Sequence, residues 1–182
     1  FVLERLVFLP RERSPSVRFN FSLANTGEDL TGNPYFLDAD IIHLHWINAG
    51  FISIKTLQRI LKSGKPVVWT FHDEWAFTGG CHLALECEAY THKCGMCPYL
   101  RKPGANDLSS RLWSKKEKVF SENDFIALTP SKWLFERARS SSLLGDFRIQ
   151  HIPNVLDTNI FQPGDRNEVA RRLGLRPETR YI

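Results

Sequence analysis

Short apolar runs alternate with stretches of helical periodicity, and this order constrains the fold more than any other feature of the chain. The apolar runs predict four strands, at 39–46, 66–71, 124–129 and 147–152. The last of these alternates in polarity, which is typical of an edge strand. Three helices are predicted between the strands, over 51–63, over 108–120 and from the N-cap Ser131 onward. Strands that alternate with helices form parallel sheets through right-handed crossovers, so the sequence predicts an α/β fold with a parallel sheet flanked by helices.

The two ends of the chain differ from this middle part. Proline, glycine and asparagine interrupt residues 1–38, so no long element is predicted there. Phe161 to Gly164 has the composition of a linker, residues 167–173 look helical, and residues 180–182 have the pattern of a strand beginning. We therefore expect one domain over 1–163 and the start of a second over 164–182.

Composition limits the classes of function. Of the 182 residues, 42% are apolar and 24% are charged, so a core is feasible. A net charge of +4 suits a phosphate-bearing or anionic partner, but there is no dense basic run, which argues against nucleic acid. Lys115, Lys116 and Lys118 are interpreted as the solvated face of the helix over 108–120.

Targeting signals are absent from the sequence as it stands. No apolar run approaches the roughly 18–20 residues that span a bilayer. The first ten residues lack the order of a signal peptide, so we expect a cytoplasmic protein. The chain does not begin with methionine, and we expect it to be an internal part of a longer protein.

Polar residues follow three of the predicted strands, at His43–Trp46, Thr70–Glu74 and Thr129–Ser131. Ligands of open parallel sheets bind outside the carboxyl ends of the strands, so these residues are expected to line one rim. His72 is the strongest catalytic candidate, because an imidazole can donate a proton to a developing negative charge or to a sugar hydroxyl near neutral pH. The alternative is a strand-end histidine that hydrogen-bonds only a backbone carbonyl.

Two further features of the rim have both functional and structural interpretations. His43 and His45 are two apart on a strand and point to the same face, where they could contact a ligand or a metal; partly buried histidines with internal partners are the favoured interpretation. The helix that opens at Ser131 could hold a phosphate on its backbone N–H groups, or simply be capped. Asp107 fits an N-cap and Glu117 a helix surface.

All four cysteines lie within seventeen residues, as Cys81-x5-Cys87-x6-Cys94-Gly-Met-Cys97. The last pair resembles a zinc knuckle, and four thiolates would form a closed, structural zinc site. Free buried thiols, disulfides and a C-x-x-C redox pair are the alternatives, and His82 or His92 could replace one sulfur. A cytoplasmic α/β domain disfavours disulfides. The loop between strand and helix is about thirty residues long, which favours a stabilising cross-link.

An ordered series of motifs resembles bacterial glycosyltransferases of family 4, which have the GT-B fold. The motifs run through residues 39–47, 64–73, 78–82, 94–98, 129–134, 152–157 and 161–163. They include Thr-Phe-His-Asp, Thr-Gly-Gly-Cys-His and Ile-Pro-Asn-Val-Leu-Asp. The subgroup that matches best acts in capsule, colanic-acid and other exopolysaccharide synthesis, and the resemblance covers about residues 36–175.

The resemblance implies a Rossmann-like N-terminal domain that binds the acceptor, facing a second domain that binds a nucleotide-sugar donor. Transfer in such enzymes usually retains the anomeric configuration without a divalent cation, with a histidine at the position of His72 close to the donor sugar. The residues expected to bind substrate are His45, Asp73, Gly79, Gly80, Ser131 and Asn154. A saccharide or lipid-linked acceptor is implied, and the latter would bring the protein to the membrane surface.

The chain departs from the family at both ends. The first strand with its glycine-rich loop and the donor domain with its paired glutamates are not in the sequence, so we expect the N-terminal half of a GT-B fold that is incomplete and transfers no sugar alone. The first predicted strand would then be an apolar edge that favours self-association. The other class of function compatible with the sequence is a non-catalytic, zinc-stabilised α/β binding module.

Overall fold

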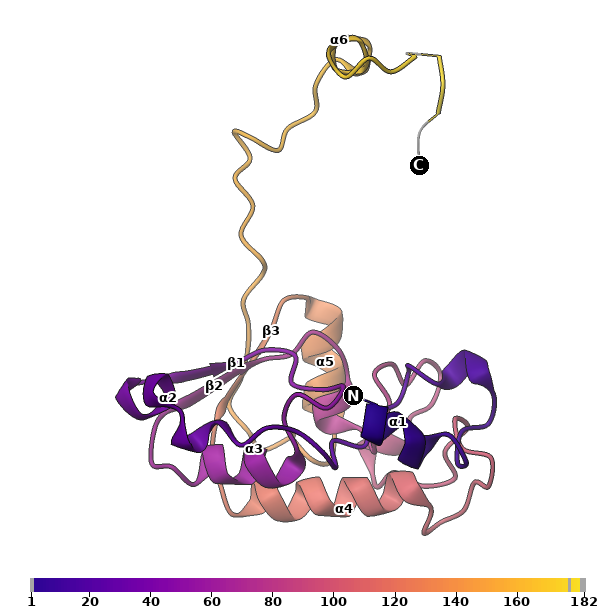
Figure 1. The fold of residues 1–182 in the computed structure, drawn as a ribbon, viewed down its shortest axis with the longest axis vertical. Helices are drawn as coiled ribbons and strands as arrows, with labels where there is room; N and C mark the ends of the chain where they lie inside the picture. Colours follow the sequence, from indigo (N-terminus) through magenta and orange to yellow (C-terminus); the bar gives the residue numbers. More distant parts are fainter. Residues whose placement is uncertain (1, 177, 181–182) are drawn as a thin grey trace.

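The computed structural model describes residues 2–176 and 178–180 (Figure 1). Its centre is a parallel sheet with the strand order β1-β2-β3-β4. The strands are β1 (Ile42–Leu44), β2 (Val67–Thr70), β3 (Ile126–Thr129) and β4 (Ile149–His151). The helices are α1 (Val2–Phe8), α2 (Pro34–Asp38), α3 (Ile54–Leu61), α4 (Leu108–Ser121), α5 (Lys132–Ser140) and α6 (Arg166–Arg172). The predicted α/β fold is confirmed, and the architecture is consistent with a Rossmann-like domain.

Helix starts follow local capping chemistry. The side chains of Ser53, Asp107 and Ser131 accept hydrogen bonds from backbone N–H groups in the first turns of α3, α4 and α5. The apolar pattern predicted a helix start at residue 51. The cap at Ser53 explains why α3 begins at Ile54 instead. In α5, Leu134 and Ala138 are buried, whereas Trp133 is about half exposed.

The main core lies between the sheet and the helices of one face, where α3 and α4 run beside each other (Figure 1). Aromatic rings fill much of it. The indole of Trp69 contacts Phe71 and Phe120 edge-on, with centroid separations of 5.2 and 6.4 Å. Each of these side chains contributes roughly 1.5–3 kcal/mol by leaving water. The core therefore holds β2 in place, and β2 leads directly into the predicted rim.

Lys116 corrects one prediction. Its side chain is fully buried, not on a solvated face. The ammonium donates to the backbone carbonyls of Trp75 and Thr78 and lies 3.4 Å from the centre of the Trp75 ring. Burial lowers the pKa of Lys116 to about 7. The residue thus ties α4 to the loop that follows β2.

The N-terminal region is more regular than the sequence predicted. In α1 the buried residues are Glu4 and Phe8, one turn apart. Glu4 accepts hydrogen bonds from the backbone N–H groups of Leu23 and Ala24, at 2.7 and 2.9 Å, and Phe8 stacks on Phe21 with ring centroids 4.9 Å apart. The sequence pattern did not predict α1, because the apolar residues of this helix mostly face solvent while the carboxylate of Glu4 faces inward.

Beyond β4 the chain runs as an extended segment to α6, which lies apart from the sheet (Figure 1). The predicted helix over 167–173 is present, shifted by one residue. The expected strand at 180–182 falls largely on residues outside the described part of the chain. The division into domains at residues 163 and 164 stays a prediction.

Candidate functional site

The carboxyl ends of β1 and β2 bring together side chains that are distant in sequence. The parallel register pairs Leu44 with Trp69, so the residues that follow the two strands emerge side by side. Three contacts join them, each between residues 27 apart: His43 with Thr70, His45 with His72, and Trp46 with Asp73. The predicted rim is therefore present along β1 and β2.

His45 and His72 form an imidazole pair. Nδ1 of His45 lies 3.0 Å from Nε2 of His72, and the ring centroids are 5.3 Å apart. Such a hydrogen bond needs one ring nitrogen to donate and the other to accept. When His45 donates, a neutral His72 carries its own proton on Nδ1, for which the described residues provide no acceptor. The pair therefore leaves a polar atom of His72 available to a ligand.

His43 extends this pair into a cluster of three imidazoles. Its ring lies 4.3 Å from that of His45, and its Nε2 is 2.9 Å from the hydroxyl of Thr70. Partial burial, together with the positive charges that His45 and His72 can carry, lowers the pKa of His43. The same-face prediction for His43 and His45 is confirmed. Both residues are largely exposed, but each ring has an internal partner, so the favoured interpretation is right about the partners and wrong about the degree of burial.

Asp73 organises the second half of the rim. One of its carboxylate oxygens accepts a hydrogen bond from the indole N–H of Trp46 at 2.8 Å and lies 2.6 Å from Nδ1 of His82. The other accepts the backbone N–H of Trp75. Nε2 of His82 contacts the hydroxyl of Ser22 at 2.8 Å. Asp73 is adjacent to His72 in sequence, but its carboxylate orients His82 and Trp46 instead.

Replacing Asp73 with asparagine tests this arrangement. Burial favours the neutral acid, but hydrogen bonds and the charge of His82 outweigh it and lower the pKa of Asp73 below 3.8. The lowered pKa means that the ionised group stabilises the fold at neutral pH and that this contribution is lost as pH falls through the folded-state pKa. We expect Asp73→Asn to reduce the free energy of unfolding by about 1–3 kcal/mol at pH 7. Urea unfolding between pH 3 and 7 should show the difference from the parent chain shrinking below pH 4; a constant difference would contradict the account.

Sequence reasoning missed two residues of this site. His82 was considered only as a substitute metal ligand, yet both of its ring nitrogens have partners in the rim. Asn48 is buried, helps line a cavity of about 10 Å³ beside His45 and His72, and its amide nitrogen has no partner among the described residues. The signal for Asn48 is its position, because it lies four residues after the end of β1, close to the carboxyl edge of the sheet. The next residue, Ala49, has a φ of +56°, a strained backbone value of the kind that concentrates at functional sites.

The two glycines assigned to substrate binding are buried and packed against other parts of the protein. A Cβ on Gly79 would meet the carbonyl oxygen of Ser109 at 2.5 Å, and one on Gly80 would meet the ring of Phe21 at 2.5 Å. Gly79 also donates its N–H to the sulfur of Cys94 at 3.0 Å. Close packing against the cysteine loop and α4 accounts for both glycines.

Ser131 and Asn154 lie elsewhere. The hydroxyl of Ser131 accepts the N–H of Leu134 at 3.2 Å and acts as the N-cap of α5. Asn154 is exposed on the extended segment after β4. Neither has a contact with the histidine cluster within residues 2–176 and 178–180. Their assignment to substrate binding stays a prediction.

The four cysteines converge on one small cavity of about 20 Å³. All are free thiols, and Cys94 and Cys97 are buried. Burial raises the pKa of each of these two to about 11, so both remain protonated at neutral pH. Because the thiolate is the nucleophile, this environment disfavours the redox interpretation of the pair.

No group of three or more His, Cys, Asp or Glu side chains in the described part of the chain is arranged to hold a metal ion as it stands. The cysteines share a cavity but are not at coordinating positions. A zinc site therefore stays a prediction.

The described helices include none long and apolar enough to cross a membrane.

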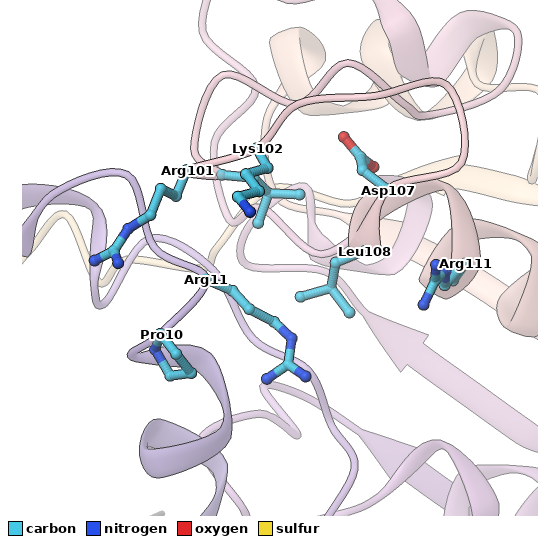
Figure 2. Close-up of a pocket in the computed structure, with 8 residues that line it drawn as sticks. Pro10, Arg11, Arg101, Lys102, Asp107, Leu108 and Arg111 are labelled. Carbon is cyan, nitrogen blue, oxygen red and sulfur yellow. The ribbon is translucent and has the colours of Figure 1, made fainter.

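A cavity lined by several cations lies away from the rim, between the end of α1 and the start of α4 (Figure 2). It shares no lining residue with the cavity beside His45 and His72.

Comparison with known proteins gives one informative similarity. No family model matches the chain, and no solved structure matches it. An alignment over 135 residues, which covers 70% of the chain, is 29% identical to an Escherichia coli K12 protein named "Putative colanic acid biosynthesis glycosyl transferase WcaC". The match covers 32% of that protein, so the matched part of the chain spans about a third of the length of its relative.

Proposed function

We propose that this chain is the acceptor-side part of a glycosyltransferase that acts in the synthesis of a cell-surface polysaccharide. The proposed enzyme is a retaining hexosyltransferase of family 4 with the GT-B fold, which moves a sugar from a nucleotide-sugar to a saccharide or lipid-linked acceptor. The similarity to the E. coli protein supports the class of reaction. The observation that supports the proposed location of the reaction is the imidazole pair of His45 and His72, which is exposed at the carboxyl edge of the sheet.

His72 is the proposed catalytic residue. With His45 donating to its Nε2, a neutral His72 presents an N–H at Nδ1, and a protonated His72 does so in either case. An N–H there can bond a sugar hydroxyl or a donor oxygen that gains negative charge as the glycosidic bond to the leaving nucleotide breaks. His45 acts as a positioning residue because it fixes the ring of His72.

Trp46 and Asp73 are the proposed saccharide contacts. The indole of Trp46 is 48% exposed, which leaves a flat apolar surface on which the C–H groups of a sugar ring can pack. The bond from its N–H to Asp73 holds this surface in place. The cavity beside the histidines holds no more than a water molecule, so the sugar is expected to lie on the open rim and not inside a closed pocket.

The experiment that tests this proposal uses the intact protein that carries this sequence. It is incubated with radiolabelled nucleotide-sugars, one at a time, and with a lipid extract that contains saccharide acceptors. Incorporation of label into acceptor without added divalent cation is the expected result, and the 182-residue chain alone should give none. Absence of transfer with every donor, or robust turnover by the chain alone, would contradict the proposal.

We also propose that the four cysteines hold one structural zinc ion that fixes the loop between β2 and α4. The supporting observations are the shared cavity, the bond from the N–H of Gly79 to the sulfur of Cys94, and the turn of Cys94 to Cys97, in which Met96 has a φ of +51°. The sulfurs would have to move together and lose their protons for the ion to bind. Four thiolates leave no open position, so the ion would have no part in the transfer reaction.

Metal analysis of the 182-residue chain tests the zinc proposal. We expect about one zinc per chain and no stoichiometric metal in Cys94→Ser. The melting temperature of Cys94→Ser should fall by at least about 4 °C, which corresponds to a loss of more than about 1 kcal/mol in the free energy of unfolding for a domain of this size. Met96→Ala is the matched control, because Met96 is an exposed residue of the same turn without a strong metal donor, and it should keep its zinc. Four titratable thiols in metal-free protein that melts normally would refute the site.

A further inference from the structure

The cavity between α1 and α4 has a volume of about 290 Å³ and is lined by four cations, Arg11, Arg101, Lys102 and Arg111. Figure 2 shows Arg11, Lys102 and Arg111 around the side chain of Leu108, with Arg101 directed away from them. The cations come from three parts of the chain: the segment after α1, the loop before α4, and the first turn of α4. Their convergence is therefore a product of the fold and not of a basic run in the sequence.

Backbone contacts fix this arrangement. The N–H of Arg101 donates to the carbonyl of Arg11 at 2.8 Å, and the N–H of Arg13 donates to the carbonyl of Tyr99 at 2.9 Å. An isolated β-bridge between Glu12 and Leu100 lies between these bonds. The two segments that carry Arg11 and Lys102 are thus held together, so the cavity does not depend on a mobile loop.

Three of the four cations of the cavity have no ion-pair partner among the described residues. Arg11 donates to the carbonyl of Val7, and Arg111 donates to that of Asn106 at 3.2 Å, but neither these two nor Lys102 forms an ion pair within residues 2–176 and 178–180. Carbonyl contacts orient a guanidinium and leave its charge and other N–H groups available. Arg101 is different, because it also interacts electrostatically with Glu12.

The one carboxylate that lines the cavity, that of Asp107, accepts hydrogen bonds from residues other than the cations. Asp107 accepts hydrogen bonds from the backbone N–H groups of Ser109 and Ser110 and from the hydroxyl of Ser109 on one oxygen. Its other oxygen accepts hydrogen bonds from the backbone N–H groups of Cys97 and Gly104. Asp107 therefore caps α4 and the cysteine turn, and it does not pair with the cations.

We propose that this cavity binds a phosphate or pyrophosphate group of a ligand that also has an apolar or sugar part. Two guanidinium groups and an ammonium around one space match the charge and the several acceptor oxygens of such a group. Pro10, Leu100 and Leu108 supply apolar lining for the remainder. A cavity of this size fits a headgroup or a small molecule, whereas nucleic acid would need an extended basic surface.

Two sources of that group are distinguishable. A soluble phosphorylated compound would use the cavity alone. A phosphate-bearing lipid headgroup would also bring a bilayer against α1, where Val2, Leu3 and Leu6 are each at least 59% exposed. Both share the same recognition chemistry, and the experiment separates them.

Isothermal titration with sodium pyrophosphate tests the phosphate site on the 182-residue chain. We expect saturable binding that weakens with salt and falls about tenfold or more in each of Arg11→Gln and Arg111→Gln, since each removes charge-assisted hydrogen bonds. Arg111→Lys, which keeps the charge without the planar fork, should bind at an intermediate level. The charge-matched controls are the single variants Lys115→Gln and Lys118→Gln, each of which removes one positive charge of α4 outside this cavity. All of these are exposed residues, and thermal melting confirms that each variant is folded.

Sedimentation with phosphatidylcholine vesicles that contain phosphatidylglycerol identifies the source. Vesicle binding that is lost in Arg11→Gln and Arg111→Gln indicates a lipid headgroup, and pyrophosphate binding without vesicle binding indicates a soluble ligand; both support the proposal. It is overturned if pyrophosphate does not bind, if either control loses as much affinity as the cavity variants, or if vesicles bind while pyrophosphate does not. None of these measurements depends on sugar transfer.

Discussion

A chain in which Glu74 is replaced by alanine is expected to lose about 3–5 kcal/mol of its free energy of unfolding, the usual cost of breaking a buried ion pair. The Glu74 side chain is fully buried and accepts hydrogen bonds from the guanidinium of Arg137 and from the backbone N–H of Ala84. It joins three parts of the molecule: the end of β2, the cysteine loop and α5. Its removal leaves the charge of Arg137 poorly compensated, with only 18% of that side chain exposed.

The position of the Arg137 guanidinium adds to the loss of unfolding free energy expected for Glu74→Ala. It lies 4.8 Å from the ring centre of Tyr90 and 5.2 Å from that of Trp133, so it cannot swing into solvent without losing these contacts. A domain of ordinary stability has about 5–15 kcal/mol in total, so Glu74→Ala should remove at least about a fifth of it. Urea unfolding monitored by tryptophan fluorescence measures the change.

Glu122→Ala is the matched control for Glu74→Ala. Glu122 pairs with Lys62 at 2.7 Å, but the two side chains are 38% and 51% exposed. An exposed pair contributes little to stability, because water and salt screen its charges, so this variant should unfold almost as the parent chain does. Similar losses in both variants would show that burial around Glu74 is not what makes its ion pair important.

Local patterns predicted the parts of the fold that local chemistry determines. The strands and the helices α3 to α6 follow from apolar periodicity, and the N-caps Asp107 and Ser131 follow from their side chains. Lys116 was misjudged although a signal was present. It lies three or four residues from Leu112, Trp113, Val119 and Phe120, which places it on the buried face of α4.

The candidate site was only partly predictable. The strand-end positions of His45 and His72 follow from the sequence, but their hydrogen bond depends on the register of β1 against β2, which no local pattern specifies. His82 reaches Asp73 through a loop whose path depends on buried contacts, such as the bond from the N–H of Glu74 to the carbonyl of His82. The convergence of Arg11 and Arg111 is equally a tertiary feature.

His72→Ala is expected to reduce sugar transfer by the intact protein between about 100-fold and 1,000-fold, the effect of removing one donor to a developing charge. The loss should be mainly in kcat, because the interaction strengthens as the bond to the leaving nucleotide breaks. His72 is exposed, so its removal should leave the melting temperature nearly unchanged. His45→Gln should cause a smaller loss, since the catalytic ring remains but is no longer fixed.

We propose that sugar transfer takes place at the imidazole rim at the carboxyl ends of β1 and β2. The most direct test is the transfer rate of the intact protein, measured at saturating donor and acceptor, for His72→Ala beside His92→Ala. His92 is an exposed histidine of the cysteine loop that has no contact with the rim in the described part of the chain. We expect a loss of at least about 100-fold for His72→Ala and of less than about threefold for His92→Ala. Equal rates for His72→Ala and the parent protein would contradict it.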